Sequence, residues 1–145
     1  MTATASSWRY DGHVGDAPLT YSRDDAGRRI TVTITGPATL DDLMRIVERQ
    51  AAEGTWGYAM LYDQRTTATS ASAGALRALL AGVDRLTQAH GPRGPVAMVC
   101  LTDEQFGMGR MYSTLGEHQG LDSEVFRDLA AAEAWLDARQ KRAGP

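Results

Sequence analysis

The residues best suited to chemistry lie in one stretch, residues 61–80, which reads LYDQRTTATSASAGALRALL. Asp63 closes an apolar run, and Arg65 opens a segment rich in threonine and serine that leads into a helical pattern. Ligands of parallel α/β sheets bind beyond the carboxyl ends of the strands, where helix N-termini attract anions. The stretch therefore fits a phosphate-binding turn, a regulatory site at Ser70 or Ser72, or a helix that one of these serines merely caps. In the first case Arg65 would supply a bidentate phosphate contact.

Arg110 is the other candidate for contact with an anion. It follows Gly107 and Gly109, but the third glycine of a dinucleotide fingerprint is missing, and the motif lies inside a helical pattern. We therefore expect the two glycines to allow close packing of the helix. Arg110 is then either an ordinary exposed arginine or the second half of an anion-binding cleft with Arg65.

Catalytic, metal-binding and cofactor-binding patterns are missing from the sequence. The three histidines lie in separate segments, and there is neither a nucleophile elbow nor a phosphate-binding loop of the glycine–lysine type. Cys100 is the only cysteine, which excludes an intrachain disulfide and a zinc–thiolate cluster. Its apolar surroundings predict a buried, unreactive thiol. We predict no catalytic residue, no metal site and no cofactor.

Length and charge limit the remaining classes of protein. A chain of 145 residues with a net charge of −3 fits one globular domain with no general attraction to nucleic acid or anionic membranes. The longest apolar run, residues 96–101, is too short to cross a bilayer, and the N-terminal segment lacks the apolar centre of a signal peptide. We expect a cytoplasmic protein without membrane insertion and without a nucleic-acid partner.

Hydrophobic periodicity and capping residues predict the element order β-β-α-β-α-β-α-β-α. The expected segments are a hairpin at 18–36, a helix at 39–54, a strand at 56–63, a helix at 72–91, a strand at 96–101, a helix at 102–120, a strand at 123–126 and a helix at 128–142. The hairpin turn is expected to place Gly27 at a positive φ. Helical spacing predicts core stripes on the first and third helices, made of Leu40, Leu43, Met44 and Val47, and of Met108, Met111, Tyr112 and Leu115.

Strands that alternate with helices imply parallel pairing with right-handed crossovers. We predict a single α/β domain over residues 17–142, with a mixed, mostly parallel sheet of four or five strands, an N-terminal hairpin and four main helices. Residues 1–16 are expected to form a flexible arm. Trp8 and Tyr10 in that arm, with Trp135 near the C-terminus, predict a homodimer.

This order resembles the STAS-like domains of bacterial anti-sigma-factor antagonists. In that family the third strand ends in an aspartate, and a loop leads to a serine followed by small residues at the start of the second helix. Asp63 and the sequence Ser72-Ala73-Gly74 match that arrangement, whereas Ala71 stands where the family commonly has an aspartate. By this resemblance, Ser72 takes the place of the phosphorylated serine. The resemblance implies a non-enzymatic regulatory module that binds a protein partner through the face around the second helix's N-terminus.

A second class of function remains open. The chain would then be a binding domain for a small ligand, such as an anion, a nucleotide or a lipid. The ligand would lie between the ends of the third and fourth strands, where α/β sheets form binding crevices.

Overall fold

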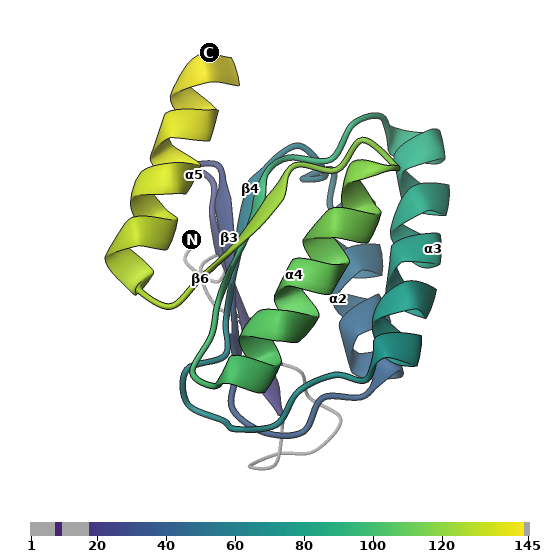
Figure 1. Cartoon of the computed structure of the whole chain (residues 1–145). Helices are drawn as coiled ribbons and strands as arrows, with labels where there is room; N and C mark the ends of the chain where they lie inside the picture. The colour runs from purple at the N-terminus through teal and green to yellow at the C-terminus, as the bar shows by residue number, and fades with distance from the viewer. Residues whose placement is uncertain (1–7, 10–17, 144–145) are drawn as a thin grey trace.

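A computed structural model of the chain describes residues 8–9 and 18–143. The strands are β1 (Trp8–Arg9), β2 (Leu19–Asp24), β3 (Arg29–Ile34), β4 (Ala59–Asp63), β5 (Val96–Val99) and β6 (Ser123–Phe126). The helices are α2 (Leu40–Ala52), α3 (Ala73–His90), α4 (Asp103–Glu117) and α5 (Leu129–Ala143). They form three layers, with α2, α3 and α4 on one face of the sheet and α5 on the other (Figure 1).

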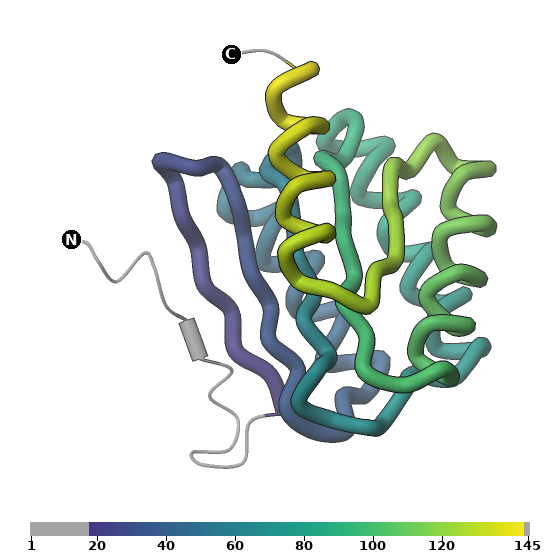
Figure 2. Tube along the Cα trace, turned by 60° about the vertical axis from the view of Figure 1, so that its left-hand side comes forward, coloured from purple at the N-terminus to yellow at the C-terminus, as the bar shows by residue number. Residues whose placement is uncertain are grey.

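The strands lie in the sheet in the same order as in the chain (Figure 2). β2 pairs antiparallel with β1 and β3, whereas β3, β4, β5 and β6 pair in parallel. Right-handed crossovers between sequential strands carry each connecting helix to the same face, which explains why α2, α3 and α4 lie together. The predicted α/β class is confirmed, with its mostly parallel mixed sheet, its N-terminal hairpin and the parallel pairing of the strands at 58–63 and 96–101.

Each face of the sheet has its own apolar core. The larger core lies under α2, α3 and α4, and the side chains of Ile30, Val32 and Ile34 in β3 alternate into it. The smaller core lies under α5, which packs on β4, β5 and β6. Its buried members are Ala59, Leu61, Ala97, Val99, Ala132 and Leu136.

The expected starts of the helices are confirmed, and so are the ends of α2 and α3, whereas α4 ends at Glu117, before the expected residue 120. Ser72 caps α3, and Thr102 begins α4 with a capping box that Gln105 completes. Gly54 and Gly91 follow α2 and α3 with φ values of 76° and 90°, a left-handed region that glycine adopts without a steric penalty. These local signals therefore fix where the helices begin and end.

The hairpin turn differs from the prediction, because Arg28 and not Gly27 has the positive φ, at 52°. The Gly27 N–H donates to Asp24 Oδ1 (3.1 Å), and Arg28 N–H donates to the carbonyl of Asp25 (3.2 Å). The Arg28 guanidinium stacks 5.0 Å from the centre of the Tyr58 ring. These contacts hold the arginine in a conformation that sequence preference assigns to glycine.

The predicted core stripe of α4 is partly wrong. Tyr112 is buried, but Met108 and Met111 are only half-buried, and Gly109 takes the position nearest the sheet. A Cβ atom at Gly109 would lie 2.9 Å from Val125 Cγ2, so the missing side chain lets the helix approach β6. Gly107 has no such neighbour, and its predicted packing role is wrong. On α2, Leu43 and Val47 are buried as expected, while Leu40 and Met44 are half-buried.

Most of the predicted arm lies outside the described residues, including Tyr10. Trp8 and Arg9 are described in their backbone, which pairs with Tyr21 and Thr20 of β2. Trp135 is half-buried and packs 5.8 Å from the Phe126 ring, between ring centres. The homodimer stays a prediction. Within residues 18–143, no helix has the length and apolar character needed to cross a membrane.

Candidate functional site

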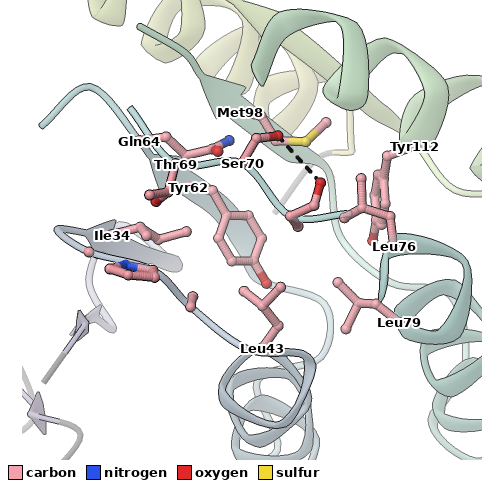
Figure 3. Close-up of a pocket in the computed structure, with 14 residues that line it drawn as sticks. Ile34, Leu43, Tyr62, Gln64, Thr69, Ser70, Leu76, Leu79, Met98 and Tyr112 are labelled. Atoms are coloured by element: carbon pink, nitrogen blue, oxygen red, sulfur yellow. Dashed lines mark hydrogen bonds between the residues drawn. The ribbon is translucent and has the colours of Figure 1, made fainter. Parts of the chain in front are cut away.

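An apolar cavity of about 130 Å³ lies at the carboxyl ends of β3, β4 and β5. It is enclosed between the sheet, α2, α3 and one residue of α4, with the loops that follow β3 and β4 around it (Figure 3). Its lining residues are Ile34, Gly36, Pro37, Ala38, Leu43, Tyr62, Gln64, Thr69, Ser70, Ala71, Leu76, Leu79, Met98 and Tyr112. Pro37 and Thr69 are exposed, so the two loops form the mouth.

Two tyrosines give this apolar lining its polar groups. Figure 3 shows the Tyr62 ring in the middle of the lining, with its hydroxyl directed toward Leu43 and away from Thr69. That hydroxyl is buried and has no hydrogen-bond partner. Tyr112 of α4 is also buried, and this burial raises the pKa of its phenol above the ordinary value. Buried hydroxyls normally find partners, so the unpartnered Tyr62 hydroxyl calls for an explanation.

Arg93 lies next to both tyrosines and is itself buried, with 8% of its surface exposed. It belongs to the loop before β5. Its Nη2 donates to Gln50 Oε1 (3.0 Å) and contacts Met60 Sδ (3.3 Å), and its guanidinium stacks 5.0 Å from the Trp56 ring centre. Its Nε and Nη1 atoms have no hydrogen-bond partner. None of the ion pairs among residues 18–143 includes Arg93.

The side chain of Gln105, which is 1% exposed, holds the loop after β4 through hydrogen bonds. Its Nε2 donates to the carbonyls of Thr67 (2.7 Å) and Thr69 (2.8 Å). Its Oε1 accepts from the backbone N–H groups of Leu101 (2.7 Å) and Thr102 (3.1 Å). One side chain therefore joins the start of α4 to the wall of the cavity.

Asp63 and Arg65, predicted as candidates at the end of β4, pair with each other. Asp63 Oδ1 accepts from the Arg65 backbone N–H (3.0 Å) and Nε (2.9 Å), and Oδ2 accepts from Nη2 (2.9 Å). The hydrogen bonds from the Arg65 side chain hold the pKa of Asp63 below its ordinary value. The negative charges of Asp128 and Glu133, near the start of α5, also stabilise the positive charge of Arg65. The pair thus lies on the α5 side and does not turn toward the cavity.

The two candidate serines have different environments. Ser72 is exposed, and its Oγ accepts from the Ala75 N–H (3.1 Å), as a capping residue does. Ser70 lines the cavity, and its hydroxyl donates to the Ala71 carbonyl (3.3 Å). Of the predicted candidates, only Ser70 belongs to the cavity wall.

Arg110 is exposed on α4, on the opposite face of the sheet from the Asp63–Arg65 pair. The structure therefore does not bring Arg110 and Arg65 together into a cleft. Cys100 is buried as predicted, and burial raises the pKa of its thiol to about 11. Within the described part of the chain, no group of three histidine, cysteine, aspartate or glutamate side chains is arranged to hold a metal.

The residues that distinguish this cavity were not candidates in the sequence. Tyr62 was visible only as one aromatic residue in an apolar strand, and Arg93 only as one arginine in the loop GPRGP. Gly94 packs against the backbone of residues 57 and 58 so closely that a Cβ atom would collide with it. This close approach lays the loop against the sheet next to the buried arginine. No local pattern reveals it.

No family model, curated protein or solved structure matches this chain.

Proposed function

We propose that this protein binds a small, largely apolar ligand in the cavity at the carboxyl ends of β3, β4 and β5. The observation that carries the proposal is the cavity itself, lined by aliphatic and aromatic side chains and bordered by two loops. Ligand sites in α/β sheets occur at this edge, and they are typically apolar with a few polar groups. Tyr62, Tyr112 and Ser70 would be those groups here.

The volume of the cavity limits the size of the ligand. A buried apolar cavity of roughly 150 Å³ takes a benzene molecule. The cavity volume of about 130 Å³ therefore fits a compact hydrocarbon body about the size of one aromatic ring. A nucleotide or a long acyl chain would need the mouth to open much further. Among the described residues that line the cavity there is no histidine, cysteine or carboxylate, so we assign it binding and no chemical step.

The regulatory function implied by the STAS-like resemblance is a separate hypothesis. It requires a protein-binding surface around Ser72, and interfaces of this kind usually have an apolar centre. Over residues 18–143, Leu101 is the only exposed large hydrophobic residue, and one such side chain does not make an apolar interface centre. The cavity therefore favours ligand binding over the regulatory hypothesis, which the Ser72 variants below test.

Methyl NMR tests the proposal directly, because the lining carries methyl groups on Ile34, Leu43, Leu76, Leu79 and Met98. We expect titration with small arenes, such as toluene and nitrobenzene, to shift these resonances and to raise the melting temperature as ligand concentration rises. The methyl groups of Leu61 and Leu136, in the core under α5, serve as the internal control. Shifts of equal size in both cores, or none in either, would refute binding in the cavity.

A pair of variants makes the test specific. Ala71→Leu places a larger side chain in the cavity wall, whereas Ala78→Leu makes the same change at an exposed position of α3. We expect Ala71→Leu to weaken binding of the arenes at least tenfold and Ala78→Leu to leave it unchanged. Equal binding by the two variants would place the ligand elsewhere.

A further inference from the structure

Arg93 is a buried cation without a matching anion. A guanidinium stays protonated at every accessible pH, so burial cannot be relieved by loss of the proton. Buried charges in proteins are normally paired with an opposite charge. The partners of Arg93 are instead the amide of Gln50, the sulfur of Met60 and the ring of Trp56, all of them neutral. Its Nε and Nη1 atoms make no hydrogen bond of normal geometry, and the polar groups next to it are the neutral phenols of Tyr62 and Tyr112.

The positive charge is connected to the cavity through Tyr62 and Tyr112. Both tyrosines line the cavity, and both lie close enough to Arg93 to interact with its charge. The Tyr62 hydroxyl and Arg93 Nη1 nevertheless make no hydrogen bond of normal geometry, with each other or with other groups. We call the part of the cavity where Tyr62 and Tyr112 lie next to Arg93 its inner end. This end combines a positive potential with phenol groups that can donate to an acceptor. In a medium of low polarity such a potential is weakly screened.

We propose that the ligand is a monocarboxylic acid with a compact hydrocarbon body, bound as the carboxylate. This inference rests on the proposed function of the cavity and names the chemical class of its ligand. The hydrocarbon body lies against Ile34, Leu76 and Met98, and the carboxylate accepts from the phenol hydroxyls at the inner end. Its negative charge compensates Arg93 through the two tyrosines.

Other ligand classes fit less well. A neutral hydrocarbon would leave the Tyr62 hydroxyl without an acceptor and the Arg93 charge without an anion. A phosphate would bring up to two negative charges to a single arginine, and it would lack the apolar body that the lining requires. A cation would be repelled by Arg93. One negative charge on a small apolar body satisfies both the lining and the buried cation.

The decisive comparison uses benzoate and nitrobenzene, which have nearly the same shape and differ in net charge. Dissociation constants are measured for the full chain at neutral pH, by titration of the cavity methyl resonances. We expect benzoate to bind at least tenfold more tightly than nitrobenzene, as hydrogen bonds to a charged acceptor predict. Raising the salt concentration should change this preference little, because the charges are buried.

Three variants test whether Tyr62, Tyr112 and Arg93 recognise the carboxylate of benzoate. Tyr62→Phe and Tyr112→Phe each remove one hydroxyl and keep the ring, and each should weaken benzoate binding roughly tenfold with little change for nitrobenzene. Tyr62→Phe also removes an unpartnered hydroxyl, so the melting temperature of the free protein should not fall. Arg93→Met should abolish the preference for benzoate. If this variant does not fold, the two tyrosine variants decide.

Each outcome has a definite meaning. Nitrobenzene bound as tightly as benzoate, or more tightly, overturns the carboxylate inference and leaves the proposed function intact. Benzoate binding that is unchanged in both tyrosine variants also overturns it, because the carboxylate is then recognised elsewhere. Binding of neither compound contradicts both the inference and the proposed function.

Discussion

The environment of Asp63 is set by its hydrogen bonds to Arg65. The carboxylate accepts three hydrogen bonds from Arg65, and its pKa is lowered for that reason. A lowered pKa in the folded state means that the ion pair contributes stability above the unfolded pKa, near 4, and that this contribution is lost as the pH falls through the folded pKa. The anion-binding role that the sequence indicates for Arg65 therefore competes with the Asp63 carboxylate, which is ionised at neutral pH.

We expect Asp63→Asn to lower the free energy of unfolding at pH 7 by about 0.5–1 kcal/mol, a small value because the Arg65 side chain is 41% exposed. The difference from the unmodified protein should shrink below about pH 4 and vanish once Asp63 is protonated. Urea unfolding at pH 7 and at pH 3 measures it. Arg65→Gln should have a similar effect at pH 7, and the double variant should cost little more than either single one. A difference that grows as the pH falls would contradict the assignment.

At the scale of elements, variants at the N-terminus of α3 distinguish the hypothesis that Ser72 is a helix cap from the hypothesis that it is a regulatory site. Aspartate caps a helix as well as serine does, so Ser72→Asp should leave the free energy of unfolding nearly unchanged. Ser72→Ala should lower it by about 1 kcal/mol. Chemical denaturation measures both variants, and Ser70→Ala serves as the control because its hydroxyl does not cap the helix.

The regulatory hypothesis makes a different claim about the same two variants. If Ser72 belongs to a regulatory surface, Ser72→Asp should change the binding of a protein partner far more than it changes stability. Unchanged arene or benzoate binding and unchanged partner binding in both variants would leave Ser72 a cap and nothing more. We expect that result, because the structure accounts for the serine through Ala75.

Gln105 links two elements that the sequence does not show to be adjacent, α4 and the loop at residues 64–71. Gln105→Leu removes the donor to two loop carbonyls and the acceptor for the Leu101 and Thr102 N–H groups, and leaves these backbone groups without that partner. We expect a loss of about 2–3 kcal/mol in the free energy of unfolding. Amide hydrogen exchange of residues 64–71 should become faster even under native conditions.

A matched change at Gln88 is the control for this effect. Gln88 is exposed on α3 and bonds only to Asp84 within the same helix, so Gln88→Leu should change stability by less than about 0.5 kcal/mol. Equal effects of the two variants would mean that Gln105 does not hold the loop.

At the scale of the whole molecule, the sequence predicted what depends on local pattern. The order of elements, the N-terminal hairpin and the cap of α3 by one of two serines all follow from periods of two and 3.6 and from capping preferences. The parallel pairing followed from the alternation of strands with helices. These signals act over a few residues, so they can be read from one chain.

The candidate site was predicted only in its location. A cavity lies at the edge that the sequence indicated, but the residues predicted there mostly bond to one another or cap a helix. Tyr62, Tyr112 and Arg93 come together from β4, α4 and the loop before β5. Their proximity depends on how the layers pack, and in particular on the close approach at Gly94 and Gly109. No spacing along the chain encodes it.

The position of α5 has a consequence for the order in which the chain can assemble. Each pair of parallel strands is connected by the one helix that lies between them in the chain. The contacts within such a strand–helix–strand unit are therefore close in sequence. α5 is different, because its apolar face packs on β4, β5 and β6 at once. Its polar contacts reach back further still, from Asp137 to Arg29 and from Gln140 to Gly27, over 108 and 113 residues. Closing loops of that length has the largest entropic cost in the fold, so α5 can complete its layer only after the three strands beneath it are paired.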